Sequence, residues 1–144
     1  MSYFDPGWNF DNTYSLLPKI LFSDTVPIPV KQPNLIIFND NLSKDLGLNF
    51  RKYSKQKLSD LFSGNYLPAG SKTIAQAYAG HQFGYFSILG DGRATMLGEH
   101  ISPNNKRFDI QYKGSGRTPY SRNGDGRATL TSMLREYIIS EAMY

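Results

Sequence analysis

The fold is decided by residues 85–113, YFSILGDGRATMLGEHISPNNKRFDIQYK. Short apolar runs over 85–89 and 94–98 are typical of strands, and Gly90-Asp-Gly92 between them is typical of a tight turn. We therefore expect these two strands to form a β-hairpin with a glycine tip. Glycines on both sides of an aspartate also allow a ligand to approach the backbone closely.

A further strand is expected after the hairpin, over 107–112. Apolar and polar residues alternate there, which places Phe108, Ile110 and Tyr112 on one face. The strand ends at Lys113, so the lysine side chain projects from a strand end. Antiparallel strands flanked by helices indicate an α+β fold.

Outside this stretch, periodicity and capping residues predict four helices, one strand and one irregular segment. The helices are expected over 39–46, 54–62, 74–78 and 128–144, and the strand over 34–38. Residues 1–30 combine aromatic side chains with four prolines, which resist regular helix and central strand. We expect them to form an irregular arm that wraps the core.

The last predicted helix carries two glutamates that could pair with Lys113. Its apolar side chains share one face: Leu130, Met133, Leu134, Tyr137 and Ile138. At about 100° per residue, Glu141 falls within this face and Glu136 lies to one side of it. A glycine loop, a strand lysine and a helix glutamate follow one another in this order in the amino-terminal lobe of protein kinases. The alternative is that all three charged residues are ordinary solvated side chains.

One hexapeptide, GDGRAT, occurs twice, at 90–95 and at 124–129. The flanking residues differ, so the two copies are not units of a stacked repeat. Glycine N–H groups beside an arginine can bind an anion such as phosphate, and the second copy also precedes a helix N-terminus, where the dipole favours an anion. The alternative is that both copies only form tight turns.

The composition of the chain excludes several classes of functional site. The chain has 144 residues, a formal net charge of +4, no cysteine and two histidines, His81 and His100. Disulfides and cysteine nucleophiles are excluded, and we expect both histidines to be satisfied in a loop or in the core rather than to bind zinc. The positive charge is compatible with anionic ligands but does not indicate nucleic-acid binding. No signal peptide or apolar span is visible, so a cytoplasmic protein that does not enter the membrane is expected.

Several long motifs make the sequence resemble the selenoprotein O family. They are AYAGHQFG at 77–84, LGDGRA at 89–94, DIQYKGSGRTPYSR at 109–122, GDGRA at 124–128 and REY at 135–137. The resemblance extends from the segment FDNTY at 10–14 to the end of the chain. It implies a kinase-like fold that binds ATP in a flipped orientation and transfers AMP to Ser, Thr or Tyr hydroxyls of proteins.

The resemblance also implies roles for individual residues. Nucleotide contacts would be made by Gly90, Gly92, Arg93, Lys113, Asp125 and Gly126. Lys113 would be the kinase-like strand lysine, and Glu136 in the REY motif would be its helix partner, so that both serve catalysis. Glu141 remains the alternative partner that periodicity favours.

Part of the family's machinery would follow residue 144. Family members are several times longer, and their catalytic aspartate and the Asn and Asp that hold Mg²⁺ or Mn²⁺ are expected beyond this sequence. We therefore expect a truncated kinase-like amino-terminal lobe in one structural unit, with an arm and small helices over 1–70, a nucleotide-binding portion over 71–144 and no carboxyl lobe. Such a chain would bind ATP without transferring AMP alone. The alternative is a noncatalytic nucleotide- or partner-binding fragment, or a gene remnant.

Overall fold

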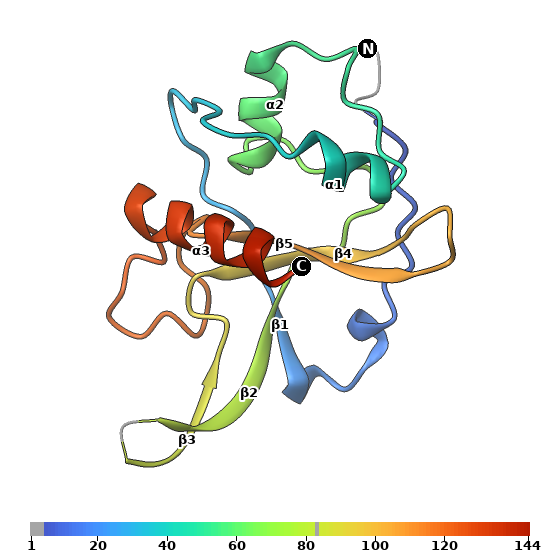
Figure 1. Cartoon of the computed structure of the whole chain (residues 1–144). Helices are drawn as coiled ribbons and strands as arrows, with labels where there is room; N and C mark the ends of the chain where they lie inside the picture. The colour runs from blue at the N-terminus through green and yellow to red at the C-terminus, as the bar shows by residue number, and fades with distance from the viewer. Residues whose placement is uncertain (1–4, 83) are drawn as a thin grey trace.

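A five-stranded antiparallel sheet forms the centre of the structure, a computed structural model that describes residues 5–82 and 84–144 (Figure 1). The strands are β1 (Phe22–Asp24), β2 (Ile74–Gln82), β3 (Tyr85–Gly90), β4 (Ala94–Ile101) and β5 (Arg107–Lys113). The α-helices are α1 (Asp40–Asp45), α2 (Lys55–Phe62) and α3 (Leu130–Met143), and two short 3₁₀ turns cover Tyr14–Leu16 and Lys19–Leu21. Residues 1–4 of the predicted arm and Phe83 of the AYAGHQFG motif lie outside the described part.

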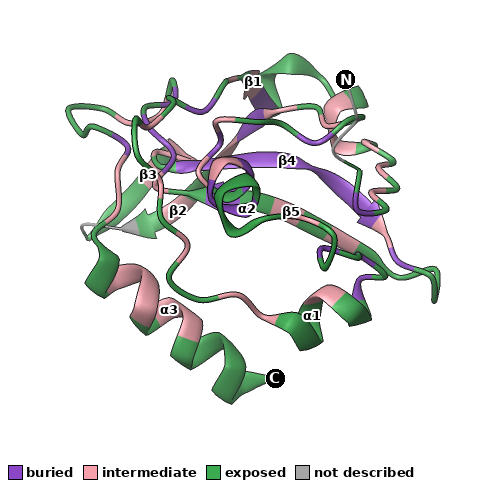
Figure 2. Cartoon of the chain, turned by 90° about the horizontal axis from the view of Figure 1, so that it is seen from above, coloured by how far each residue is buried: buried purple, intermediate pink, exposed green. Residues whose placement is uncertain are grey.

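The sheet has the order β1-β2-β4-β5, and β3 pairs with β2 outside this path. All pairings are antiparallel. Strand β4 lies between β2 and β5 and is buried along almost its whole length, as the purple band in Figure 2 shows. The mixed α and β architecture with an antiparallel sheet confirms the coarse fold class.

The predicted face of β5 is confirmed. Phe108 and Ile110 are half-buried and Tyr112 is buried, whereas the residues between them are exposed. This face packs against the larger core cluster, which contains Leu46, Leu48, Phe50, Leu58 and Leu61 from the α1–α2 region. The Tyr112 hydroxyl donates a hydrogen bond of 2.6 Å to the Leu61 carbonyl, and burial raises the pKa of Tyr112. β5 is therefore anchored to the end of α2.

The prediction of a helix over 74–78 is wrong, because this segment begins β2. Ile74, Ala75 and Gln76 pair with β1, and Ala77 onward pairs with β3. Alanines favour helix intrinsically, but hydrogen bonding to neighbouring strands on both sides overrides a weak local preference.

The predicted glycine-tipped hairpin is also wrong in its pairing. The strands over 85–89 and 94–98 exist, but β3 and β4 both lie along β2, at Ala77↔Gly90 and Ile74↔Met96. Three residues along β2 thus correspond to six residues along the segment that leads from β3 into β4. Residues 90–93 therefore form a bulge rather than a hairpin tip. The Asp91 N–H donates to the Gln76 carbonyl at 2.9 Å and keeps the bulge against β2.

No strand forms over 34–38, contrary to the prediction. The segment runs along α2, where the Leu35 N–H donates to the Ser59 hydroxyl at 2.9 Å, and Leu35 and Phe38 pack against the larger core cluster. Leu35 and Phe38 therefore reflect packing against the core and not sheet formation, whereas Ile36 and Ile37 are exposed.

The expected wrapping of the arm over residues 1–30 is confirmed at residues 9–11, but the expectation that the whole arm is irregular is wrong at Phe22–Asp24, because these residues pair with β2 as strand β1. Phe10 forms a bridge with His100, the Ile101 N–H donates to the Asn9 carbonyl at 2.9 Å, and the Asp11 N–H donates to the Glu99 carbonyl at 2.8 Å. The arm thus covers the part of β4 that β2 leaves unpaired.

The three remaining helix predictions are confirmed by their caps. The side chains of Asn39, Ser54 and Thr129 accept hydrogen bonds at the N-termini of α1, α2 and α3. α3 lies at the border of the molecule and has no buried residue (Figure 2). Of its predicted apolar face, Met133, Leu134 and Tyr137 are half-buried, but Leu130 and Ile138 are exposed.

The β2–β3 ribbon extends away from the rest of the sheet (Figure 1). Between Lys72 and Asp91 there is no Asp, Glu, Lys or Arg, and Tyr78, Phe86 and Ile88 are exposed. None of the helices in the described part of the chain is long and apolar enough to span a bilayer.

Candidate functional site

Three charged side chains meet where β5 ends beside α3. The Lys113 Nζ lies 2.8 Å from the Glu136 Oε2, and the Arg93 Nη2 lies 4.0 Å from the Glu136 Oε1. The side chains of Lys113 and Glu136 are 36% and 43% exposed, so the ion pair contributes only about 0.2–1 kcal/mol to stability. Its importance is geometric, since it fixes one lysine near a solvent-accessible surface.

The sheet register brings Arg93 and Lys113 to the same place. Ala94 pairs with Lys113 across β4 and β5, and the Gly114 N–H donates to the Arg93 carbonyl at 2.6 Å. Arg93 is the last residue of the bulge and Lys113 is the last residue of β5. Arg93, within the first copy of the hexapeptide, therefore lies beside Lys113 at the end of β5.

Asp91 lies at the centre of the bulge and is half-buried. Its Oδ2 accepts a hydrogen bond of 3.0 Å from the Gln76 N–H. Burial raises the pKa of the Asp91 carboxyl, while the Gln76 hydrogen bond and the charge of Lys113 act in the opposite direction. The carboxylate thus serves the backbone of β2 instead of pointing to a ligand.

Two hydroxyl groups hold the bulge from the other side. The Thr118 Oγ1 donates to the Asp91 carbonyl at 2.5 Å, and the Ser121 Oγ donates to the Gly92 carbonyl at 2.6 Å. The Ser121 Oγ also accepts from the Thr118 N–H at 2.8 Å. With these carbonyls occupied, the bulge has a defined shape before any ligand arrives.

Gly90 permits a close approach by Tyr120. A Cβ atom at position 90 would lie 2.5 Å from the Tyr120 ring and 2.8 Å from the Gln76 carbonyl oxygen. The Tyr120 hydroxyl lies 2.9 Å from the Ser23 hydroxyl of β1. Gly90 is therefore required for packing of the loop, in addition to any contact with a ligand.

The second hexapeptide copy has another structure. The Asp125 Oδ1 accepts from the Arg127 N–H at 2.8 Å, and Gly126 is buried with φ of +69°. The Gly116 N–H donates to the Gly126 carbonyl at 3.1 Å, and the Arg127 guanidinium donates to the Ile28 carbonyl at 3.2 Å. This copy is a loop folded against the exit of β5, and its final threonine caps α3.

Ser121 connects the two copies directly. Its hydroxyl donates to Gly92 of the first copy, and its carbonyl accepts from the Gly124 N–H of the second at 2.9 Å. Two segments that are 34 positions apart in sequence therefore share one serine. Segment 118–121 thus holds the bulge through hydroxyl groups, and its only local sequence signal is three hydroxyl residues, Thr118, Tyr120 and Ser121, close to Lys113.

Glu141 and His100 have hydrogen-bond partners away from Lys113. Glu141 is exposed and accepts a hydrogen bond of 2.8 Å from the Asn39 amide, so it is not the partner of Lys113. His100 is buried and satisfied as expected, with its Nδ1 accepting from the Asn9 N–H and its Nε2 lying 2.7 Å from the Leu46 carbonyl oxygen. Over 5–82 and 84–144, no group of three or more His, Asp or Glu side chains is arranged to hold a metal ion.

The arrangement suits a phosphate-bearing ligand. Arg93 and Lys113 provide two cations at the edge of one pre-shaped loop, and Glu136 contacts both. Lys and Arg neutralise phosphate charge, and a carboxylate that contacts both cations restricts their positions.

Comparison with known proteins gives one consistent result. The sequence model of the family described as "Protein adenylyltransferase SelO" matches residues 8–144. Relatives named "Protein nucleotidyltransferase YdiU" are 59% identical over the whole chain in Nitrosococcus oceani and 60% identical over 96% and 97% of it in Pelagibacter ubique and Brevibacillus brevis. The chain spans 28–29% of the length of these relatives. Since the family match covers nearly the entire chain, the chain belongs to the SelO protein adenylyltransferase family.

Proposed function

We propose that this chain binds ATP at the bulge of residues 90–93 and forms the ATP-binding portion of a protein adenylyltransferase with a kinase-like amino-terminal lobe. The observation that carries this proposal is the position of Glu136, whose two carboxylate oxygens face Lys113 and Arg93. The order of glycine loop, strand lysine and helix glutamate along the chain supports it. In this proposal, residues 71–144 are the nucleotide-binding portion.

Each residue has a specific task in the proposed complex. Lys113 and Arg93 neutralise phosphate charge, and Glu136 positions Lys113. Gly90 and Gly92 bring the loop backbone close to the nucleotide, and Asp125 and Gly126 contribute contacts from the second loop, which Ser121 holds next to the first. Alignment and charge neutralisation are the main requirements of phosphoryl-type transfer.

The proposed reaction is AMP transfer to a protein hydroxyl. The hydroxyl oxygen of a Ser, Thr or Tyr side chain forms a bond to the α-phosphorus of ATP, the bond from the α-phosphorus to the bridging oxygen breaks, and pyrophosphate leaves with the electron pair. The hydroxyl proton passes to a base. The family resemblance assigns that base and the ligands of Mg²⁺ or Mn²⁺ to positions beyond residue 144, so we expect ATP binding without transfer from this chain alone.

An ATP titration by calorimetry tests the binding proposal. Lys113→Ala is expected to weaken ATP binding at least about tenfold, because it removes a charge-assisted contact. Lys106→Ala, at an exposed lysine in the β4–β5 turn, is the matched control and should leave the affinity unchanged. Equal affinities for the parent chain and Lys113→Ala would refute the proposed site.

A labelling assay tests the transfer. The chain is incubated with ATP labelled on its α-phosphate, Mg²⁺ or Mn²⁺ and a generic protein acceptor. We expect no incorporation of label by this chain alone. Incorporation that disappears in Lys113→Ala would contradict this expectation and show that residues 1–144 suffice for catalysis.

A further inference from the structure

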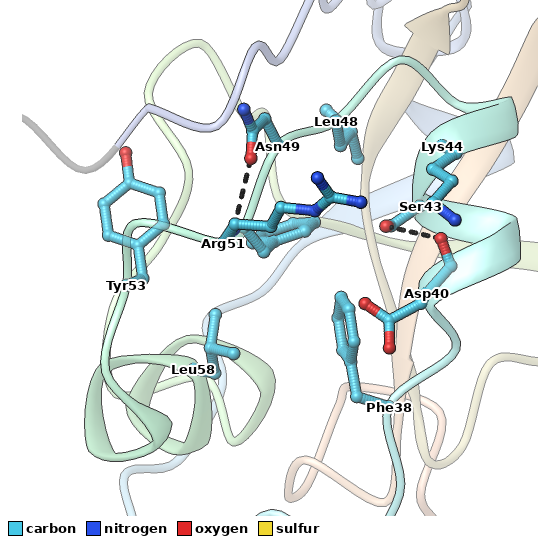
Figure 3. Close-up of a pocket in the computed structure, with 10 residues that line it drawn as sticks. Phe38, Asp40, Ser43, Lys44, Leu48, Asn49, Arg51, Tyr53 and Leu58 are labelled. Atoms are coloured by element: carbon cyan, nitrogen blue, oxygen red, sulfur yellow. Dashed lines mark hydrogen bonds between the residues drawn. The ribbon is translucent and has the colours of Figure 1, made fainter.

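A cavity lies between α1, the segment 48–53 and α2, and none of its lining residues belongs to the Lys113–Glu136 region. Its volume is about 500 Å³, within the range of ligand-binding pockets (Figure 3). Leu48, Phe50 and Leu58 are buried and form its apolar floor. Figure 3 shows the Arg51 side chain extending from its loop toward Ser43 of α1, so a cation lies over this floor.

Positive charge exceeds negative charge around this cavity, which Asp40 lines together with Lys44 and Arg51. We define the basic surface as Lys44, Arg51, Lys52, Lys55 and Lys57, all of which are exposed. None of these five side chains forms an ion pair with another described residue. Within residues 44–57, five cations stand against one acid, Asp45, for a net charge of +4, which equals the charge of the whole chain. The remaining residues hold eleven cations and eleven acids and are therefore neutral.

The start of α2 is electrostatically unfavourable. Its first turn contains Lys55 and Lys57 and no acidic residue. The positive end of the helix dipole lies at this turn and favours acidic side chains by about 0.3–1 kcal/mol each. Departures from such local preferences, here basic residues at a helix N-terminus, are expected at functional sites. An anionic partner at this turn would relieve the repulsion.

We infer that the basic surface and its cavity bind an acidic polypeptide segment that inserts one large apolar side chain between α1 and α2. Lys52, Lys55 and Lys57 do not line the cavity, so the cations extend beyond the reach of a small anion inside it. Single-stranded nucleic acid is recognised by bases stacking on exposed aromatic faces, whereas the aromatic lining residues here are buried (Phe50) or half-buried (Phe38 and Tyr53). This surface needs no nucleotide, so its test is independent of the proposed ATP site.

Fluorescence anisotropy with a labelled peptide tests the inference. The peptide consists of Asp and Glu residues around one phenylalanine, and it is titrated with the full chain. Arg51→Glu is expected to weaken binding about tenfold or more, because it reverses a charge over the cavity. Lys106→Glu causes the same change in net charge at the β4–β5 turn and should alter binding less than about twofold. Equal effects of the two variants would indicate nonspecific attraction and overturn the inference.

Two further titrations test the partner's chemistry. Replacing the peptide's phenylalanine with serine should weaken binding about tenfold, since an apolar side chain loses its burial. An unchanged affinity would exclude insertion into the cavity. A single-stranded oligouridylate of equal charge should bind more weakly than the peptide, and tighter RNA binding would replace the polypeptide partner with a nucleic acid. Thermal unfolding of both variants provides the folding control.

Discussion

The two GDGRAT copies have identical sequences and different structures. In the first, residues 90–95, the backbone leaves β3, forms a bulge along β2 and enters β4 with Thr95 buried. In the second, residues 124–129, it folds against the exit of β5 and ends at the N-cap of α3 with Thr129 exposed. Six identical residues therefore adopt a bulge followed by a strand in one place and a loop followed by a helix in the other.

The aspartates show what decides the difference. The Asp91 carboxylate accepts a hydrogen bond from Gln76, fifteen positions away, whereas the Asp125 carboxylate accepts one from Arg127, two positions away. Where a strand such as β2 is available, the motif uses a long-range partner. Without one, it closes a local turn. The hexapeptide thus specifies chemical groups, and its surroundings specify conformation.

The largest difference between the copies is expected at their third residue. Gly126 has φ of +69°, and an added Cβ would lie 2.0 Å from the Gly116 carbonyl oxygen; the corresponding distance from Gly92 to the Tyr120 carbonyl oxygen is 3.0 Å. Gly126→Ala should lower the free energy of unfolding by at least about 2 kcal/mol, and Gly92→Ala by less than about 1 kcal/mol. Urea unfolding measures both. Equal losses would mean that the two loops have the same conformation.

The arginines are expected to differ in ligand binding. Arg93 lies beside Glu136 and Lys113, whereas Arg127 is bound to the Ile28 carbonyl of the arm. Arg93→Ala should weaken ATP binding about tenfold, and Arg127→Ala less than about twofold. Calorimetry on the two variants makes the comparison. A loss of the same size in Arg127→Ala would assign the nucleotide to both copies equally.

The final threonines should respond differently to one conservative change. Thr95→Ser deletes a buried methyl group and should cost about 1 kcal/mol of unfolding free energy. Thr129→Ser keeps the hydroxyl that accepts from the Ser132 N–H, so the helix cap is retained and the cost should be below about 0.3 kcal/mol. Chemical denaturation measures both variants. A larger cost at Thr129 would contradict the assignment of its role to the hydroxyl alone.

The aspartates provide the smallest test, through pH. Burial raises the pKa of Asp91, so the folded chain holds that proton more tightly than the unfolded chain, and the stability due to this group falls as pH rises above about 4. Asp91→Asn should remove this pH dependence. Between about pH 4 and about pH 7, the unfolding free energy of the variant should therefore increase by less than about 1 kcal/mol relative to that of the parent chain. Asp125→Asn removes the same charge from an exposed side chain and serves as the control. No difference between the two variants would contradict the role of burial.

The sequence predicted elements better than their pairing. Strands ending at Gly90 and Lys113 and helices capped by Asn39, Ser54 and Thr129 depend on local residues, and they were found within a few positions. The pairing of β3 with β2 depends on contacts such as that of Asp91 with Gln76, which no local pattern contains. A five-residue segment such as 74–78 is too short for its pattern to distinguish a helix from a strand, so the partner strands decided the outcome there.

The site residues were predictable to different degrees. The position of Lys113 at a strand end follows from the alternation of β5, but periodicity favoured Glu141 over Glu136, and the structure pairs Lys113 with Glu136. The argument that favoured Glu141 assumed that the apolar face of α3 packs into a core, and no residue of α3 is buried. The hydroxyl contacts of Thr118 and Ser121 to the bulge require a folded loop and leave no periodic signal.

The uncharged β2–β3 ribbon leaves one edge of the sheet without a charged residue to protect it. Sheet edges in soluble proteins are normally guarded by lysine, proline or a bulge, which oppose pairing with another molecule. Here no charged residue occurs from position 73 to 90, and Ile88 is 85% exposed on a strand that, within the described residues, pairs on one side only. Concentrated samples should therefore self-associate through this edge. Ile88→Lys should reduce this self-association, because a charge on the edge strand opposes pairing with another molecule.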